Sequence, residues 1–271
     1  MKILFIGDIV GRSGRSLLKD FLGYVRNEYK IDVVVANGEN AAHGNGLTRK
    51  VLDELYSFGI DVITSGNHIW DKREIVDIIN NEEHLIRPVN YPAGVPGQGY
   101  TFYKCGDSSI CIINVMGRVF MNPIDCPFTS VDKVIDLCSE TADYIIVDFH
   151  GEATSEKIAF GYYVDGRVTA VFGTHTHVQT ADAKILPGGT AYITDAGMTG
   201  PINSVIGSDK DAIIKKFITG MPTRFDVAGG EAQLNAVILE TADDGKARKV
   251  TALNQTASEL ERRYGGNDKD D

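Results

Sequence analysis

The chain has 271 residues, of which 43% are hydrophobic and 24% charged, and its formal net charge is −10. This composition is ordinary for a soluble globular protein, and the length suits one large α/β domain. The acidic balance argues against a general nucleic-acid binder, because such proteins need a basic surface to contact phosphates.

We expect no signal peptide at the N-terminus of this sequence. Only four apolar residues, 3–6, precede the first Gly-Asp pair, which is too short for a signal peptide, and no run approaches the ~18 apolar residues of a membrane span. The four cysteines include no C-x-x-C pair. We therefore expect a cytoplasmic protein without a disulfide framework or a cysteine zinc site, and no membrane partner.

The first third of the chain alternates apolar strands with helical patterns. Strands are expected at 2–6, 32–36 and 60–64. A helix is expected at 13–29, and a second helix begins after its cap residue Thr48. Each strand ends in a polar loop. Alternation at this period predicts parallel β-α-β units with helices on the faces of the sheet.

The rest of the chain is less regular. Prolines predict a long irregular connection over 84–107, followed by an antiparallel pair at 100–103 and 109–115. A helix is expected at 131–138, and strands at 144–149, 167–172 and 190–193. Segments 233–240 and 249–254 flank Asp244-Gly245, a strong hairpin signal. We expect a single sandwich-like α/β domain over 1–264 and a disordered polar tail at 265–271.

Residues that can bind metals cluster at the strand exits. In open α/β sheets, ligand sites lie at the carboxyl ends of the strands, so residues distant in sequence would converge there. Each of the following comes directly after an expected strand: Asp8, Glu39, Asn67, His68, His150, His175 and His177.

Each element also has a purely structural interpretation. Asp8 could cap the helix that follows it, and Glu39 with Asn40 could serve turn geometry. In an extended segment, His175 and His177 would point both rings to one side, because side chains alternate with a period of two. His43 either faces the site or is a solvated loop histidine.

The donor types restrict the metal. Carboxylate, amide and imidazole groups without a thiolate suit Mn²⁺, Fe²⁺/³⁺ or Zn²⁺ rather than Mg²⁺ or Ca²⁺. Seven candidate groups are too many for one catalytic ion that keeps an open position. Two ions about 3.5–4 Å apart, bridged by one carboxylate, would use them all.

The sequences of these loops are similar to those of a known family. The segments GDIVGRSGR, NGENAAHGNGLT, TSGNHIWD, DFHGEATSEK, GTHTHVQTAD and TDAGMTGP resemble the calcineurin-like metallophosphoesterases, and in detail their bacterial YmdB-type branch. The resemblance covers nearly the whole chain. Two departures from the wider superfamily stand out: Glu39 replaces the usual bridging Asp, and Gly11 replaces the Asp that normally follows the first Asp by three residues.

The resemblance implies a metallophosphoesterase-like layered α/β sandwich with a mixed sheet core flanked by helices. It implies that Asp8, Glu39, Asn40 and His177 bind one ion, and that Glu39, Asn67, His150 and His175 bind the other. Iron or manganese is the expected metal, with zinc as a further option.

The implied activity is hydrolysis of a phosphodiester, with 2′,3′-cyclic nucleotides as the substrate class. A hydroxide bridging the ions would attack phosphorus while His68, an imidazole beside the metals, protonates the leaving group. Arg12, His43 and the segment 197–201 are candidates for substrate recognition, although Arg12 also fits a solvated surface residue. A regulatory protein that senses metal and nucleotide with little turnover is the alternative, and a homo-oligomer is left open.

Overall fold

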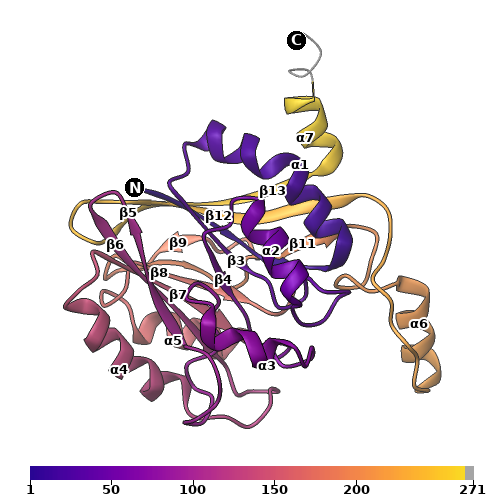
Figure 1. Cartoon of the computed structure of the whole chain (residues 1–271), viewed down its shortest axis with the longest axis horizontal. Coiled ribbons are helices and arrows are strands. Elements are labelled where there is room, and N and C mark those ends of the chain that lie inside the picture. Colours follow the sequence, from indigo (N-terminus) through magenta and orange to yellow (C-terminus); the bar gives the residue numbers. More distant parts are fainter. Residues whose placement is uncertain (266–271) are drawn as a thin grey trace.

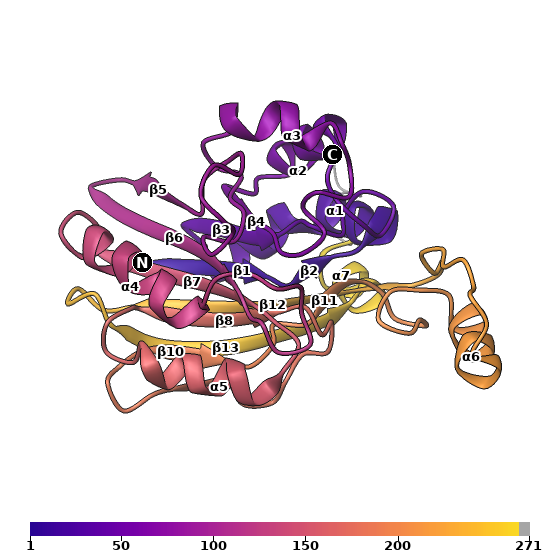
Figure 2. The same cartoon turned by 90° about the horizontal axis from the view of Figure 1, so that it is seen from below.

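Both faces of the first strand are apolar, and each face packs against a different layer. In the computed structural model, which describes residues 1–265, strand β1 (Lys2–Ile6) directs Leu4 and Ile6 toward helices. Its alternate residues Ile3 and Phe5 face a second sheet, where the Phe5 and Phe172 rings lie 5.1 Å apart. The result is four layers, helix, sheet, sheet and helix (Figures 1 and 2).

The first sheet has seven strands, and the candidate ligand loops from the N-terminal part of the chain follow its strands. Its order is β2-β11-β12-β1-β3-β4, with β13 paired to β12. Strand β1 runs parallel to β3 and antiparallel to β12. The bounds are β2 (Asp8–Ile9), β3 (Val33–Asn37), β4 (Val62–Thr64), β11 (Met198–Pro201), β12 (Ala232–Thr241) and β13 (Ala247–Thr256).

The second sheet has six strands in the order β5-β6-β7-β8-β10-β9. Its central strands are parallel, so their carboxyl ends share one edge. The bounds are β5 (Tyr100–Cys105), β6 (Ser108–Met116), β7 (Tyr144–His150), β8 (Ala170–Thr174), β9 (Lys184–Ile185) and β10 (Ala191–Ile193).

Helices cover the two outer faces. Helices α1, α2 and α7 pack on the seven-stranded sheet, and α4 and α5 pack on the six-stranded sheet (Figure 2). Helix α6 projects away from both layers (Figure 1). The bounds are α1 (Gly11–Tyr29), α2 (Arg49–Ser57), α3 (Ile75–Ile78), the 3₁₀ turn η1 (Ile79–Asn81), α4 (Pro127–Ser139), α5 (Thr154–Tyr163), α6 (Lys210–Thr219) and α7 (Ala257–Tyr264).

The predicted layered sandwich with mixed sheets is confirmed, and so is the hairpin around Asp244-Gly245. Three details were wrong. The strand expected at 167–172 begins only at Ala170, because a turn after α5 occupies the preceding residues. Helices α5, α6 and α7 were not predicted. The segment 197–201 was expected as a recognition loop, but its residues Met198–Pro201 form the buried strand β11.

The cysteine prediction is also corrected. Cys111 on β6 and Cys138 on α4 form a disulfide, although the sequence suggested none. Both side chains belong to the core between the six-stranded sheet and its helices. They are 27 residues apart, so no short spacing motif in the sequence indicates the pair.

Two further expectations concern the ends and the membrane. Helix α7 ends at Tyr264, and the expected tail lies, apart from Gly265, outside the described residues. Within residues 1–265, no helix combines the length and apolarity needed to cross a membrane.

Candidate metal centre

The carboxyl ends of the central strands bring the expected metal ligands together. The loops after β1, β3 and β4 and the ends of β7 and β8 meet at one edge of the two sheets. Asp8, Glu39 and His150 are completely buried there. Charged groups are rarely buried without a counter-charge or a metal ion, so a counter-charge or a metal ion is expected at this edge.

One group of ligands forms around His150. Its Nε2 atom lies 2.9 Å from Asn67 Oδ1, 3.0 Å from Glu39 Oε1 and 3.0 Å from His175 Nδ1. The Glu39, His150 and His175 ligand atoms all lie within 4.8 Å of one another. Four possible donor atoms therefore lie close together.

The second group forms around His177. Its Nε2 atom lies 3.2 Å from the Asn40 side-chain amide and 3.8 Å from Asp8 Oδ1. The assigned amide orientation turns Asn40 Nδ2 toward the ring, and a flip of that amide would present the oxygen instead. The side chains of Asp8, Asn40 and His177 thus lie close together.

Two buried carboxylate oxygens in the centre accept no hydrogen bond from the described residues. Asp8 Oδ1 accepts no hydrogen bond from any described residue, and Glu39 Oε1 lies near His150 Nε2 but outside hydrogen-bonding geometry. Their other oxygens are engaged, since Asp8 Oδ2 accepts from the His175 backbone N–H and Glu39 Oε2 accepts from that of His68. An unpaired buried carboxylate oxygen is costly, and a cation would satisfy it. The oxygen and imidazole donors fit a dinuclear centre of Fe, Mn or Zn.

The pKa values of the buried groups in the centre are shifted as well. Burial raises the pKa of Asp8. Burial also acts to raise the pKa of Glu39, but the nearby His150 and His68 outweigh it and hold that pKa at about 2. Burial acts to lower the pKa of His150, but the nearby Glu39 and Asp8 outweigh it and raise that pKa to about 9. Burial and the neighbouring His150 lower the pKa of His175 to about 3. A metal ion at His150 Nε2 would compete with a proton for the same lone pair.

The expectation of an extended His-x-His segment was wrong. Strand β8 ends at Thr174, and both His175 (φ 101°) and His177 (φ 64°) adopt positive φ angles. The two rings still reach the centre, but in different ligand groups. Non-glycine residues in this backbone region are strained, and such strain gathers at functional sites.

A buried ion pair holds this strained segment. Lys157 Nζ on α5 donates to the Thr174 carbonyl and to Asp195 Oδ2, each at 2.6 Å. The same Asp195 oxygen accepts from the backbone N–H of Thr176 at 3.0 Å and from its hydroxyl at 2.8 Å. The residues on both sides of His175, Thr174 and Thr176, are therefore fixed.

The alternatives for the acidic loops are now decided. The residue before α1 is Val10, which makes no side-chain cap, so Asp8 does not cap that helix. The loop after β3 is indeed a turn, yet the Glu39 side chain points into the centre and is completely buried.

A polar relay behind His150 was not predicted. Thr174 Oγ1 donates to Asp148 Oδ1 at 2.7 Å and lies 2.9 Å from His150 Nδ1. Because its single proton is used, Thr174 must accept from His150 Nδ1–H, which leaves the Nε2 lone pair facing the ligands. A visible clue was Asp148 itself, an acidic residue inside an otherwise apolar strand.

We expect Thr174→Val to weaken metal binding by ~10–100-fold, because groups that orient a metal-binding histidine have effects of this size. Competition with a chelator would measure the affinity. Thr190→Val is the control, because this buried hydroxyl donates to the Val168 carbonyl. Thr190 lies just before β10, at the edge of the sheet opposite the metal centre. Equal metal affinity in Thr174→Val and wild type would contradict the relay.

Gly66 gives the His150 ring its space. A methyl group at this position would overlap the imidazole, whereas a methyl group at Gly23 on α1 meets nothing within 4 Å. Overpacking a tight site costs typically ~1–3 kcal/mol. We expect Gly66→Ala to lower both the melting temperature and metal affinity, and Gly23→Ala to preserve both. Calorimetry and metal titration of the two variants would check this, and normal metal affinity in Gly66→Ala would refute it.

His68 lies beside the centre rather than in it. Its backbone N–H donates to Glu39 Oε2 at 2.9 Å, and its Nδ1 lies 2.8 Å from Asp71 Oδ2. The contact with Asp71, which was not predicted, orients the ring and leaves Nε2 free. His68 lines a cavity of about 440 Å³ above the ligands.

The two candidate recognition residues are placed differently. His43 lines the cavity above the ligands, with a positive φ of 61°. Arg12 does not line it and instead borders an adjoining cavity. Arg12 is therefore not placed to hold a phosphate at the metal ligands themselves.

Comparison with known proteins identifies close relatives. A family model described as YmdB-like protein matches residues 4–253. A Bacillus subtilis protein named 2′,3′-cyclic-nucleotide 2′-phosphodiesterase is 50% identical over 246 residues, covering 91% of this chain and 93% of the relative. A crystal structure of a novel phosphatase from Mycoplasma pneumoniae is 38% identical with a TM-score of 0.89, covering 94% of this chain and 93% of that one.

A more distant likeness concerns the fold alone. A putative 5′-nucleotidase from Staphylococcus aureus is 13% identical with a TM-score of 0.59, and the match covers 94% of this chain and 54% of that chain.

Proposed function

Since the chain belongs to the YmdB-like protein family, we propose that it is a metal-dependent phosphodiesterase that hydrolyses 2′,3′-cyclic nucleotides. The resemblance noted in the sequence is confirmed, and the chain is a phosphoric diester hydrolase. The observation that supports the metal dependence is a pair of buried carboxylate oxygens, Asp8 Oδ1 and Glu39 Oε1, that accept no hydrogen bond and lie among converging imidazoles.

The ligands divide into two sets around Glu39. Asp8, Glu39, Asn40 and His177 would hold one ion, and Glu39, Asn67, His150 and His175 the other. Bound there, the two ions would lower the pKa of a water molecule and offset the charge that develops on the phosphoryl oxygens. Iron or manganese suits these donors best, and zinc is compatible with them.

The protein's own part in the reaction is positioning and proton transfer. The oxygen of water adds to phosphorus, one ring P–O bond breaks, and the departing ribose oxygen takes a proton to give a nucleotide monoester. His68 Nε2 is the proton donor in this proposal, because Asp71 engages Nδ1 and Glu39 anchors the His68 backbone.

The experiment is metal-dependent hydrolysis. Purified protein would be stripped with a chelator, reloaded with Mn²⁺, Fe²⁺ or Mg²⁺, and given bis-p-nitrophenyl phosphate and 2′,3′-cyclic AMP. We expect turnover of both substrates with Mn²⁺ or Fe²⁺, and much less with Mg²⁺, because imidazole donors disfavour it. Stoichiometric metal and nucleotide binding without turnover would instead support a sensor.

A further inference from the structure

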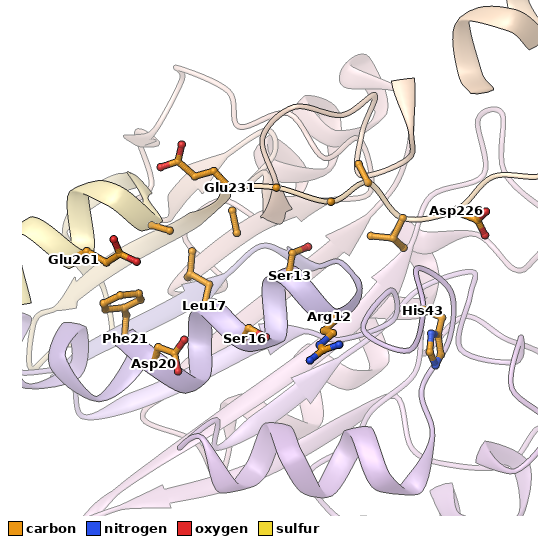
Figure 3. Close-up of a pocket in the computed structure, with 16 residues that line it drawn as sticks. Arg12, Ser13, Ser16, Leu17, Asp20, Phe21, His43, Asp226, Glu231 and Glu261 are labelled. Atoms are coloured by element: carbon orange, nitrogen blue, oxygen red, sulfur yellow. The ribbon is translucent and has the colours of Figure 1, made fainter. Parts of the chain in front are cut away.

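A second cavity of about 620 Å³ opens beside the metal centre. The two cavities share His43, Asp226 and Val227 in their walls. Helix α1 and the 226–232 segment line the second cavity along its length (Figure 3). A pocket of ~300–1,000 Å³ suits a small ligand, so each of the two cavities alone has room for one unit of a larger substrate.

The chemistry of this cavity changes from one end to the other. Arg12 and His43 lie toward the end shared with the metal centre, and Phe21, Asp20 and Glu261 lie at the other (Figure 3). The Arg12 side chain makes no hydrogen bond or ion pair with the other residues in 1–265. An unengaged guanidinium is suited to a phosphate, and an aromatic ring to a base.

We propose that this cavity binds the nucleotide that precedes the cyclic phosphate in a short oligoribonucleotide. Arg12 holds the phosphate that links the two nucleotides, and Phe21 contacts the preceding base. The inference rests on the proposed function, because it takes the terminal cyclic phosphate to lie at the metal centre. It extends the substrate class from free cyclic nucleotides to RNA fragments that end in a 2′,3′-cyclic phosphate.

The far end of the cavity limits the length of the fragment. Asp20, Glu231 and Glu261 line it, and their carboxylates repel a further phosphate while accepting hydrogen bonds from base N–H groups. The α1 wall from Arg12 to Phe21 spans nine residues, or roughly 13 Å at the helical rise. This charge pattern favours a dinucleotide over a long RNA, in keeping with the acidic chain.

A smaller groove offers a different path from Arg12. It has a volume of about 300 Å³ and is lined by Arg12, Arg15 and Lys19. Arg15 is already engaged by Glu54, at 3.0 Å, and by the Ala41 carbonyl. Lys19 borders this groove and not the larger cavity, so it provides a control on the same helix.

The test compares two substrates in the metal-loaded enzyme: 2′,3′-cyclic AMP and the dinucleotide of adenosine that ends in a 2′,3′-cyclic phosphate. We expect kcat/KM for the dinucleotide to be higher by ~10-fold, the size of one stacking or charged phosphate contact. Arg12→Ala and Phe21→Leu should bring the ratio of the two kcat/KM values close to 1. Lys19→Ala should leave the ratio at its wild-type value.

Equal kcat/KM for the two substrates in the wild type would overturn the inference. Loss of the ratio in Lys19→Ala but not in Phe21→Leu would also overturn it, by placing the preceding nucleotide in the smaller groove. If neither substrate is hydrolysed, the proposed function fails separately. Binding of the dinucleotide 3′-monophosphate then decides the cavity: ~10-fold weaker binding to Arg12→Ala supports it, and unchanged binding refutes it.

Discussion

Replacing Glu39 with Gln is expected to reduce turnover by at least ~10³. Glu39 is completely buried and is the residue proposed to contact both ions, so its charge serves both ligand groups. Charge stabilisation by a metal site is worth several kcal/mol, and each 1.36 kcal/mol is tenfold in rate. The amide keeps the shape of the side chain but removes the negative charge that two cations require. Metal analysis of the purified variant should show less than the full two ions per chain.

The matched control is Glu152→Gln. Glu152 also lies near a ligand, with its Oε2 atom 3.2 Å from His175 Nε2, but its side chain is 49% exposed at the cavity rim. Its removal should leave metal content at the wild-type level and turnover within a few-fold. Full metal content and activity in Glu39→Gln would contradict the bridging role. Equal losses of turnover in Glu39→Gln and Glu152→Gln would show that negative charge near the cavity, and not a bridging role of Glu39, is what turnover requires.

The positions of the candidate ligands could be anticipated from the sequence, because they follow from strand topology. Once parallel strands are expected, their exits must share an edge, and Asp8, Glu39 and His150 sit at three of those exits. The expectation holds even where local detail was wrong. His175 and His177 reach the centre through a strained turn rather than an extended strand, because the strand topology places the loop and the Asp195 network shapes it.

The features that escaped prediction depend on contacts between distant segments. Lys157 and Asp195 are unremarkable in sequence, and only the packing of α5 against the end of β8 brings them together. The Cys111–Cys138 disulfide likewise depends on how α4 packs on the sheet. Arg12 was a candidate contact in the sequence, but the cavity that it lines could not be known before α1 was placed beside the 226–232 segment.

Replacing His68 with Ala is expected to slow hydrolysis of 2′,3′-cyclic AMP by ~10²–10⁴, the usual contribution of a general acid. The ribose oxygen is a poor leaving group and needs a proton as the P–O bond breaks. Bis-p-nitrophenyl phosphate releases a stable phenolate, so its hydrolysis should fall far less. Metal content should remain complete, because no ligand atom of the centre is supplied by the His68 ring.

Asp71→Asn provides the graded control for this role. Asp71 Oδ2 lies 2.8 Å from His68 Nδ1, and the amide can keep a hydrogen bond there while losing its charge. We expect an intermediate loss on 2′,3′-cyclic AMP and little change on the activated ester, since the ring is still held but less strongly polarised. Equal losses on both substrates in His68→Ala would mean that His68 positions the substrate or the metals instead of donating a proton. If His68→Ala loses activity only on the cyclic nucleotide and keeps its metals, the result supports His68 as the proton donor.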